Sequence, residues 1–456
     1  MPQKYKINLR ISIIFTIFAA DFQKLPIMTY LNRIFDQTLS DYLEAFGAVL
    51  IEGPKWCGKT TTAEQQAKSV LKMQNPDEQE ANLSTAQTKP SILLKGESPR
   101  LIDEWQVAPQ LWDAVRNEVD ERQDVGQFIL TGSNAVDKKK IKHTGNSRIA
   151  RLKMMPMSLW ESQESNGKVS LQELFDKPDL DIDGLQSDLT IEQLVFAACR
   201  GGWPGSLSRK SDKAKLLIAK NYFNTVCESD IQSIDDVDRN PELAKAILRS
   251  YARNISTFAK KTLLIEDVNA TAETLTPPTF DDYQDALQRL FVIQDVKAWN
   301  PAIRSKTAIR SGLKRELVDP SIVVAALGLS PAGLERDMKT FGFIYECLCA
   351  RDLKAYSYKL GGELSYYHDR YDLEADFVLH IEDGRYALIE CKLGSKEIEE
   401  GASHLIELRD LVREYNKTER QVPLREPDLL IVLTGGKIAY TRPDGVKIIP
   451  VGCLKD

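Results

Sequence analysis

One eight-residue segment constrains this chain more than any other, because it matches a loop that belongs to a single fold class. It reads GPKWCGKT over residues 53–60, which satisfies the pattern GxxxxGK[ST] at every position. The apolar run GAVLIE precedes it, and helix-forming residues follow it to position 71. A strand before the loop and a helix after it are the context that the pattern requires, so the sequence predicts an α/β domain with a parallel sheet.

The chemistry predicted for this loop is the binding of ATP. Backbone N–H groups of the loop and the positive end of the following helix would surround the phosphates. Lys59 would place a charge at the β and γ oxygens, and the Thr60 hydroxyl would ligate Mg²⁺. The residues expected to contact the nucleotide here are Gly53, Pro54, Lys55, Trp56, Cys57, Gly58, Lys59, Thr60 and Thr61.

An acidic pair follows a second apolar stretch, in PRLIDEWQ at residues 99–106. Asp103 would complete the Mg²⁺ shell, and Glu104 is placed to polarise the attacking water. Adjacent Asp and Glu favour hydrolysis over phosphoryl transfer to a small molecule. A small-molecule kinase is therefore the disfavoured alternative.

Further polar residues follow the third predicted strand, in FILTGSN at 128–134. Ser133 and Asn134 are candidates for sensing the γ-phosphate, with a plain turn as the alternative. Arg148 or Arg151 could reach phosphate, in the same chain or from a neighbouring subunit of a homo-oligomer, unless each is simply a surface arginine.

Length and composition favour several domains. A chain of 456 residues exceeds one ordinary core. The formal net charge of −6 means that any DNA contact needs a local basic patch. Seven scattered cysteines without a CxxC pair argue against a disulfide framework or zinc site and favour a reducing cytoplasm, and only four histidines are present.

The first 27 residues are expected to be an upstream extension. Lys4, Lys6 and Arg10 precede an apolar run at 11–20 that superficially resembles a secretory signal. The run is too short to cross a bilayer, and an exported ATPase would find no ATP. Met28 opens an amphipathic segment and is the expected start, with a membrane-associated leader as the alternative.

The C-terminal part contains a predicted hairpin with three charged residues on one face. Two apolar-rich strands flank a turn at 382–384, so Ile381 pairs with Arg385 and Asp376 falls opposite Glu390. The strand period of two places Lys392 beside Glu390. Carboxylates that hold Mg²⁺ beside a lysine suit phosphodiester cleavage. The arrangement resembles the PD-(D/E)xK nuclease core, in which Asp376 and Glu390 would hold the metal and Lys392 would assist. Glu346, on the preceding predicted helix, could be an additional acid.

The middle of the chain is predicted to be helical. The stretches 241–259, 262–269, 278–290 and 291–299 could form a winged helix. Its supposed recognition helix is acidic, so a packing role is favoured over DNA reading. A basic run is the better DNA-facing candidate, with a solvated charged face as the alternative. The run consists of Arg304, Lys306, Arg310, Lys314 and Arg315.

Taken together, the motifs resemble one family, the prokaryotic AAA-type ATPases with a restriction-endonuclease-like C-terminal domain. The resemblance rests on the segments at 53–60, 99–106, 128–134, GNSRIARLKMMPMSLWE at 145–161 and GGWP at 201–204, and it extends from Met28 to the end. In related signal-transducing ATPases a Gly-x-Pro element contacts adenine, which implies that Gly202 and Pro204 line the base. The sequence departs from the family at the N-terminal extension and at Ser147, where a glycine often precedes the arginine.

The expected organisation is an extension at 1–27, a P-loop ATPase domain at 28–205, a helical, winged-helix-like middle at 206–305, and a nuclease-like α/β domain at 306–456. The expected function is an ATP-hydrolysing switch coupled to a nuclease-like domain that acts on DNA. The alternative is a signalling or partner-binding ATPase whose nuclease fold is inactive.

Overall fold

The computed structural model describes residues 30–133, 147–235, 237–271, 274–299, 312–417 and 423–456. The predicted extension at 1–27 lies outside these ranges. Contacts divide the chain into two units, 1–32 and 33–456, and the features below belong to the second unit. Within the described ranges, no helix combines the length and the apolar character needed to cross a membrane.

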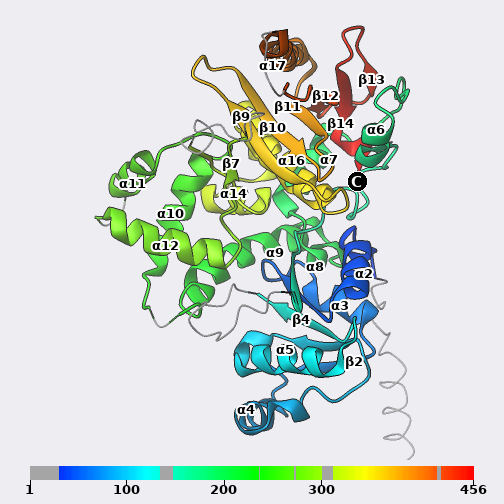
Figure 1. Ribbon diagram of the computed structural model, residues 1–456. Coiled ribbons are helices and arrows are strands. Elements are labelled where there is room, and N and C mark those ends of the chain that lie inside the picture. Colours follow the sequence, from blue (N-terminus) through cyan, green and yellow to red (C-terminus); the bar gives the residue numbers. More distant parts are fainter. Residues whose placement is uncertain (1–29, 134–146, 236, 272–273, 300–311, 418–422) are drawn as a thin grey trace, which may run out of the picture. The chain divides into compact units, whose positions relative to one another are not determined.

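The first part of this unit is built on the parallel sheet predicted from the P-loop. Its strands are β1 (Ala48–Glu52), β2 (Ser69–Lys72), β3 (Arg100–Asp103), β4 (Phe128–Gly132) and β5 (Ile149–Lys153). They are arranged in the order β2-β3-β4-β1-β5, and every pairing is parallel (Figure 1). The C-terminal ends of β1, β3 and β4 therefore meet at one edge, where the candidate nucleotide residues follow.

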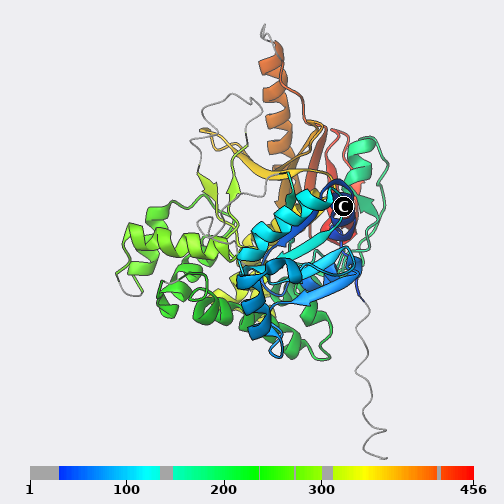
Figure 2. The same cartoon turned by 60° about the horizontal axis from the view of Figure 1, so that its bottom comes forward.

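Both faces of this sheet are buried, as the apolar composition of its strands requires. Ala48 and Leu50 of β1 pack into a core shared with α5 (Gln110–Arg122). Val49 and Ile51 point the other way, into a core shared with α2 (Phe35–Ala45) and α3 (Lys59–Gln66). Figure 2 shows the sheet between these helices.

Two local predictions in this part were wrong. The helix expected to reach residue 71 ends at Gln66, and β2 follows as an edge strand paired with β3. The polar stretch at 74–91 was expected to be a loop, but it contains α4 (Gln79–Thr88). Six of its ten residues are the helix formers Gln, Glu, Ala and Leu, but burial of only Asn82 and Ala86 leaves too narrow a buried stripe for a periodicity argument.

The middle is helical, as predicted, and contains a small antiparallel ribbon. Pairing between Asp281 and Lys261, and between Asp282 and Arg239, gives the acidic helix of this region a packing role. The elements are α7 (Ile191–Arg200), α8 (Pro204–Leu207), α9 (Asp212–Thr225), the π-helix η4 (Val226–Asp230), α10 (Pro241–Arg253), α11 (Lys261–Asn269), α12 (Pro277–Arg289), β7 (Val296–Lys297), β8 (Leu313–Lys314), α14 (Pro320–Leu327) and α15 (Pro331–Leu334).

The C-terminal part, called the tail below, is a mixed sheet between two long helices. The order of the strands is β13-β14-β12-β11-β10-β9. Helix α17 covers one face and α16 packs on the other (Figure 1). Their bounds are α16 (Met338–Ser357), β9 (Glu363–His368), β10 (Glu374–His380), β11 (Tyr386–Lys392), α17 (Ile398–Lys417), β12 (Leu429–Thr434), β13 (Tyr440–Thr441) and β14 (Lys447–Pro450).

The predicted hairpin register is confirmed. Strands β10 and β11 are antiparallel and pair Phe377 with Ile389, which places Asp376 opposite Glu390. The backbone N–H of Ile381 donates to the carbonyl of Arg385 over 2.9 Å, as expected for a three-residue loop. A register shift between Ala375 and Val378 follows on the β9 side, so Asp376 lies with Glu346 of α16 around Lys314, whereas Glu390 and Lys392 lie against Gly401 of α17.

Residues 165–187 hydrogen-bond to the tail. Strand β6 (Val169–Ser170) pairs with β15 (Leu454–Lys455), and α6 (Leu171–Asp176) follows it close to β14 (Figure 1). The N–H of Ser187 also donates to the carbonyl of Lys437 over 2.8 Å. The predicted domain boundary at residue 205 assigned this segment to the ATPase domain. In the structure the segment is hydrogen-bonded to the tail.

Candidate functional site

The P-loop leaves β1 through a turn that only glycine fits. Gly53 has a φ of +154°, and a Cβ there would lie 2.3 Å from the carbonyl oxygen of Met154. Gly58, with a φ of +105°, immediately precedes α3. Both positions suit glycine for a steric reason, which supports the reading of the motif.

Lys59 is held against the loop that it belongs to. Its ammonium group donates to the carbonyl oxygens of Gly53 at 2.9 Å and Pro54 at 2.8 Å. The residue is 5% exposed. These contacts keep a positive charge at the mouth of the loop, where an incoming phosphate can exchange for the carbonyls.

Thr60 and Asp103, predicted as Mg²⁺ ligands, lie in direct contact. The Thr60 hydroxyl donates to Oδ1 of Asp103 over 2.6 Å, and the Thr131 hydroxyl donates to the same oxygen over 2.7 Å. Hydroxyl and carboxylate oxygens are the donors that Mg²⁺ prefers, so this pair fits the ion. Thr131 was missed at the sequence level, although a hydroxyl at the end of the strand between β1 and β3 was the available signal.

Glu104 is fixed by a network of its own. Its backbone is left-handed, with a φ of 56°, and its N–H donates to the Thr131 hydroxyl over 3.2 Å. The Ser133 hydroxyl donates to one carboxylate oxygen over 2.8 Å, and the Gln106 amide donates to the other. Ser133 therefore positions the carboxylate of Glu104. Asn134, the second predicted sensor, lies outside the described residues.

These groups open into a cavity of about 690 Å³. Trp56 stands at its side, 42% exposed, with its ring 5.4 Å from that of Tyr222. Tyr222 in turn stacks on Trp203 at 4.2 Å. The residues around the cavity are Lys55, Trp56, Gly58, Lys59, Thr60, Thr61, Gln74, Glu104, Ser133, Trp203, Pro204, Gly205, Arg209 and Ile218.

Only part of the GGWP element, residues 201–204, lines this cavity. Pro204 lines it together with the P-loop. Gly202 lies behind it, with its N–H donating to Asp319 over 2.8 Å and its carbonyl accepting from the N–H of Met157 over 2.7 Å. Arg209, which the sequence did not single out, adds a cation to the lining.

The predicted arginine is not brought to the loop. Arg148 precedes β5 at the opposite edge of the sheet, where it pairs with Asp120 over 2.7 Å. A role for Arg148 within its own chain is therefore not supported by the fold, while a role in a neighbouring subunit stays a prediction. Arg151 lies over the Trp112 ring and 3.5 Å from Glu52.

One buried arginine supports the loop from behind. Arg33 pairs with Glu161 over 2.8 Å and donates to the carbonyl oxygens of Cys57 at 2.8 Å and Met155 at 2.9 Å. Its side chain is almost fully buried. The guanidinium thereby ties the P-loop to the segment after β5.

Of the predicted hairpin residues of the tail, Lys392 and Glu390 are in direct contact, and Asp376 bonds to the backbone of the residue between them. Asp376 accepts the N–H of Cys391 at 2.8 Å, and Lys392 pairs with Glu390 at 3.1 Å. His404 of α17, missed at the sequence level, approaches Glu390 at 3.8 Å. Burial raises the pKa of Glu390, and the nearby Asp376 carboxylate raises it further.

A buried lysine also reaches this cluster, and it corrects the predicted DNA-facing run. Lys314 of β8 is fully buried and pairs with Glu346, with Asp376 at 3.2 Å and with Glu374 at 3.3 Å. Arg315 is buried as well and pairs with Asp295 at 2.7 Å. Neither cation faces outward, because each neutralises buried carboxylates. The other three members of the run lie outside the described residues.

The tail carboxylates do not fit a metal ion as they stand. Among the described residues no group of three or more Asp, Glu, His or Cys side chains is arranged to hold one. The position between Glu346, Glu374 and Asp376 is taken by the ammonium of Lys314. The two predicted Mg²⁺ ligands of the P-loop site are in direct contact, whereas in the tail an ammonium group lies between the carboxylates.

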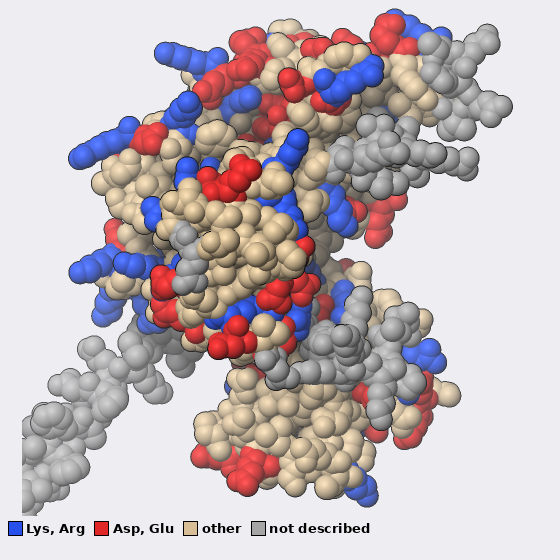
Figure 3. Space-filling view, turned by 90° about the vertical axis from the view of Figure 1, so that its left-hand side faces the viewer, with Lys and Arg blue, Asp and Glu red and all other residues tan. Residues whose placement is uncertain are grey.

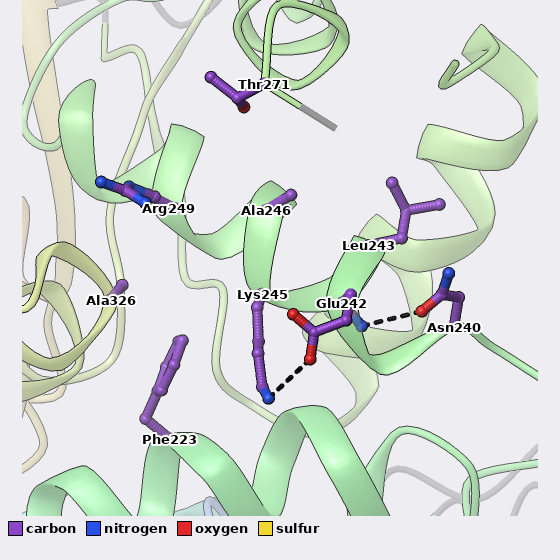
Figure 4. A pocket seen from close by; sticks show the side chains of 9 residues that line it. All are labelled: Phe223, Asn240, Glu242, Leu243, Lys245, Ala246, Arg249, Thr271 and Ala326. Carbon is purple, nitrogen blue, oxygen red and sulfur yellow. Dashed lines mark hydrogen bonds and ion pairs between the residues drawn. The ribbon is translucent and has the colours of Figure 1, made fainter. Parts of the chain in front are cut away.

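Another cavity, of about 520 Å³, lies between α9 and α10 (Figure 4). Lys245 points into it and pairs with Glu242 and Glu228, each at 2.9 Å. Since these charges are matched within the protein, the cavity is not assigned a ligand.

Comparison with known families agrees with the geometry of the first part. A family model described as an AAA domain matches residues 45–163. The chain carries an AAA-type P-loop domain. Two further models, both described as domains of unknown function, match residues 191–333 and 341–454. The unmatched stretch between the first two models contains the segment that bonds to the tail.

Solved structures with similarity to the chain are distant. A Walker-type ATPase of Pyrococcus abyssi matches 67% of this chain and 99% of its own, at 12% identity and a TM-score of 0.40. A signal transduction ATPase with a tetratricopeptide repeat sensor from Pyrococcus horikoshii matches 73% and 48%, at 13% identity and a TM-score of 0.24. The Drosophila ORC bound to DNA matches 62% and 89%, at 12% identity and a TM-score of 0.20. No curated protein matches the sequence.

Replacement of Arg33 by methionine should weaken both the fold and the nucleotide site, because Glu161 would be left buried and unpaired. We expect a loss of about 3–5 kcal/mol in the free energy of unfolding, measured by urea denaturation, together with weaker ATP binding. The control is Arg116→Met, which breaks a more exposed pair with Asp120. A change no larger than that of the control would contradict the assignment.

Proposed function

We propose that this protein is an ATP-binding and ATP-hydrolysing switch. The observation that carries the proposal is the contact of Thr60, Asp103 and Thr131 beside a separately held Glu104. Thr60 and Asp103 would hold Mg²⁺, and the Glu104 carboxylate would orient water, at the same edge of the sheet as the P-loop. Hydrolysis requires these two functions next to the γ-phosphate.

Each residue of the site would have a separate role in ATP binding or hydrolysis. Lys59 and the loop N–H groups bind the phosphates, while Thr60 and Asp103 hold Mg²⁺, which neutralises charge on the phosphate oxygens. Glu104 orients the attacking water. Pro204, next to the buried Trp203, supports the proposal that the GGWP element lies beside adenine, with Gly202 shaping its backbone.

The proposal predicts different defects for two substitutions. Lys59→Ala should abolish ATP binding, because the phosphates lose their central cation. Glu104→Gln should keep ATP binding but slow hydrolysis by about 10²–10⁴-fold. Binding of a fluorescent ATP analogue and phosphate release would measure the two effects.

Lys95→Ala serves as the control for these variants, since Lys95 is an exposed lysine of the same domain. It should behave as the wild type. Hydrolysis by Lys59→Ala at the wild-type rate would refute the assignment of this site.

A route from the nucleotide to the middle begins in the loop itself. Lys55 pairs with Asp230 of η4 at 2.5 Å, and Trp56 contacts Tyr222 of α9. Asp230 is buried, whereas Lys55 remains partly exposed toward the cavity. Bound phosphates would compete with Asp230 for the ammonium of Lys55. We infer that ATP binding loosens this pair and so changes the packing of the middle.

Asp230→Asn tests this route. Without a competing carboxylate, ATP should bind several-fold more tightly, while the response of residues 226–230 to nucleotide should be lost. Hydrogen exchange with and without a non-hydrolysable analogue would report the response. Asp212→Asn, which breaks an exposed pair on α9, is the control. An unchanged response in Asp230→Asn would exclude the pair as the link.

A second proposal concerns the tail, which we infer is nuclease-like and directed at DNA. It is supported by the contact of Lys392 with Glu390 and by the hydrogen bond from the N–H of the next residue, Cys391, to Asp376. A cavity of about 760 Å³ lined by Glu346 and Lys392 opens beside them. The alternative, a signalling or partner-binding ATPase with an inactive tail, is favoured by the absence of a metal-ready group among the described residues.

The surface gives no extensive DNA platform on the side seen in Figure 3. There, lysine and arginine side chains are interspersed with aspartate and glutamate, as expected from a net charge of −6. Phosphate contacts require concentrated positive charge. The tail cavity does not concentrate positive charge either, because Lys339 and Lys392 share its lining with Glu346, Glu397 and Glu400.

Incubation of the folded protein with supercoiled plasmid, Mg²⁺ or Mn²⁺, and ATP would decide between the two tail hypotheses. Active cleavage predicts nicking that Asp376→Asn removes. Nicking that persists in Asp376→Asn would point to a contaminant. Absence of nicking under every condition, by the wild type and by Lys314→Met alike, would favour the inactive alternative, without bearing on ATP hydrolysis.

A further inference from the structure

The acidic cluster of the tail contains a cation that the protein itself supplies. Lys314 belongs to β8 of the middle ribbon, whereas its partners belong to α16 and β10 of the tail. Besides the three carboxylates, its ammonium donates to the carbonyl oxygen of Asp376 at 3.2 Å. One side chain therefore joins two regions that separate family models match.

The surroundings of this ammonium are those of a bound ion. Its nitrogen lies over two aromatic rings, 5.0 Å from the ring centre of Phe377 and 5.7 Å from that of Phe258, which is within the range of a cation–π contact. The Lys314 side chain is 0% exposed. Burial alone would lower the pKa of Lys314, but the charges of Glu346, Asp376 and Glu374 raise it well above its ordinary value.

One carboxylate of this cluster, Asp376, is also a predicted metal ligand. Asp376 is the hairpin acid opposite Glu390, and burial together with the Asp376 charge raises the pKa of Glu346. A divalent cation bound to oxygen requires ligand distances of about 2.0–2.6 Å. An ammonium and such an ion cannot share this space, because repulsion between two cations in a buried site is strong.

We propose that Lys314 is a built-in counter-ion that excludes a divalent metal from the tail site, so that the middle ribbon holds this site in a metal-free state. A regulatory role of Lys314 in cleavage rests on the proposed nuclease-like function of the tail. The effect of Lys314 on metal binding does not rest on it. Metal binding at Asp376 and Glu390 then requires that Lys314 leave the cluster. Regulation would act through the position of β8 relative to the tail.

Titration of nucleotide-free protein with Mn²⁺, followed by electron paramagnetic resonance of the free ion, tests this inference. Wild-type protein should show no binding that depends on Asp376. Lys314→Met keeps the length of the side chain and removes its charge. This variant should bind one Mn²⁺ more than the wild type does, with an affinity for the tail site at least tenfold higher than that of the wild type. The additional site should disappear in Lys314→Met combined with Asp376→Asn.

The matched control is Lys354→Met. Lys354 is a lysine of α16 whose ammonium donates to the carbonyl of Gln294 at 2.8 Å rather than to the tail carboxylates. Its replacement should create no Mn²⁺ site. Should Lys314→Met fail to fold, Lys314→Met with Glu346→Gln removes one charge of each sign and leaves Asp376 and Glu390 available. This double variant should also gain the site.

Two results would overturn the proposal. One is a folded Lys314→Met protein, or the folded double variant, that binds Mn²⁺ no better than the wild type. The other is a wild-type protein that already binds Mn²⁺ in a manner lost in Asp376→Asn, which needs no variant of Lys314 to fold. Mn²⁺ binding without plasmid nicking would instead reject the nuclease assignment and leave the role of Lys314 intact.

Discussion

The hydrogen bond between Thr60 and Asp103 is the contact on which the nucleotide site depends. The two residues are far apart in sequence and meet because parallel strands end at a common edge. Thr131 joins them from the strand between, so each of three neighbouring segments contributes one group. Displacement of β3 or β4 by one residue would turn Asp103 or Thr131 to the other face of the sheet and remove its hydrogen bond.

Much of this site could be predicted because its chemistry is local. The P-loop carries its own glycines, lysine and threonine within eight residues. The hairpin register of the tail followed equally from turn length and strand period. In both cases short-range geometry decides which side chains meet, and the pattern in the sequence contains that geometry.

What could not be predicted depends on packing between distant segments. Nothing in the run around Lys314 distinguishes a buried cation from an exposed one, because charge alone does not specify burial. The strand partner of Ser69–Lys72 and the burial of α4 likewise appear only when neighbours are in place. Arg148 was assigned by its position in a motif, yet the direction of β5 places it at the far edge of the sheet.

The two candidate sites apply the same electrostatic rule with opposite outcomes. At the P-loop, Asp103 accepts hydrogen bonds from neutral hydroxyls and Lys59 is held by carbonyls, so both charges remain available to a ligand. In the tail, the charges of Asp376, Glu346 and Lys314 already satisfy one another. A buried carboxylate is tolerated only with compensation, and an internal ammonium provides that compensation without a metal. Reactivity of the tail would thus depend on removal of a partner, whereas that of the P-loop depends on arrival of one.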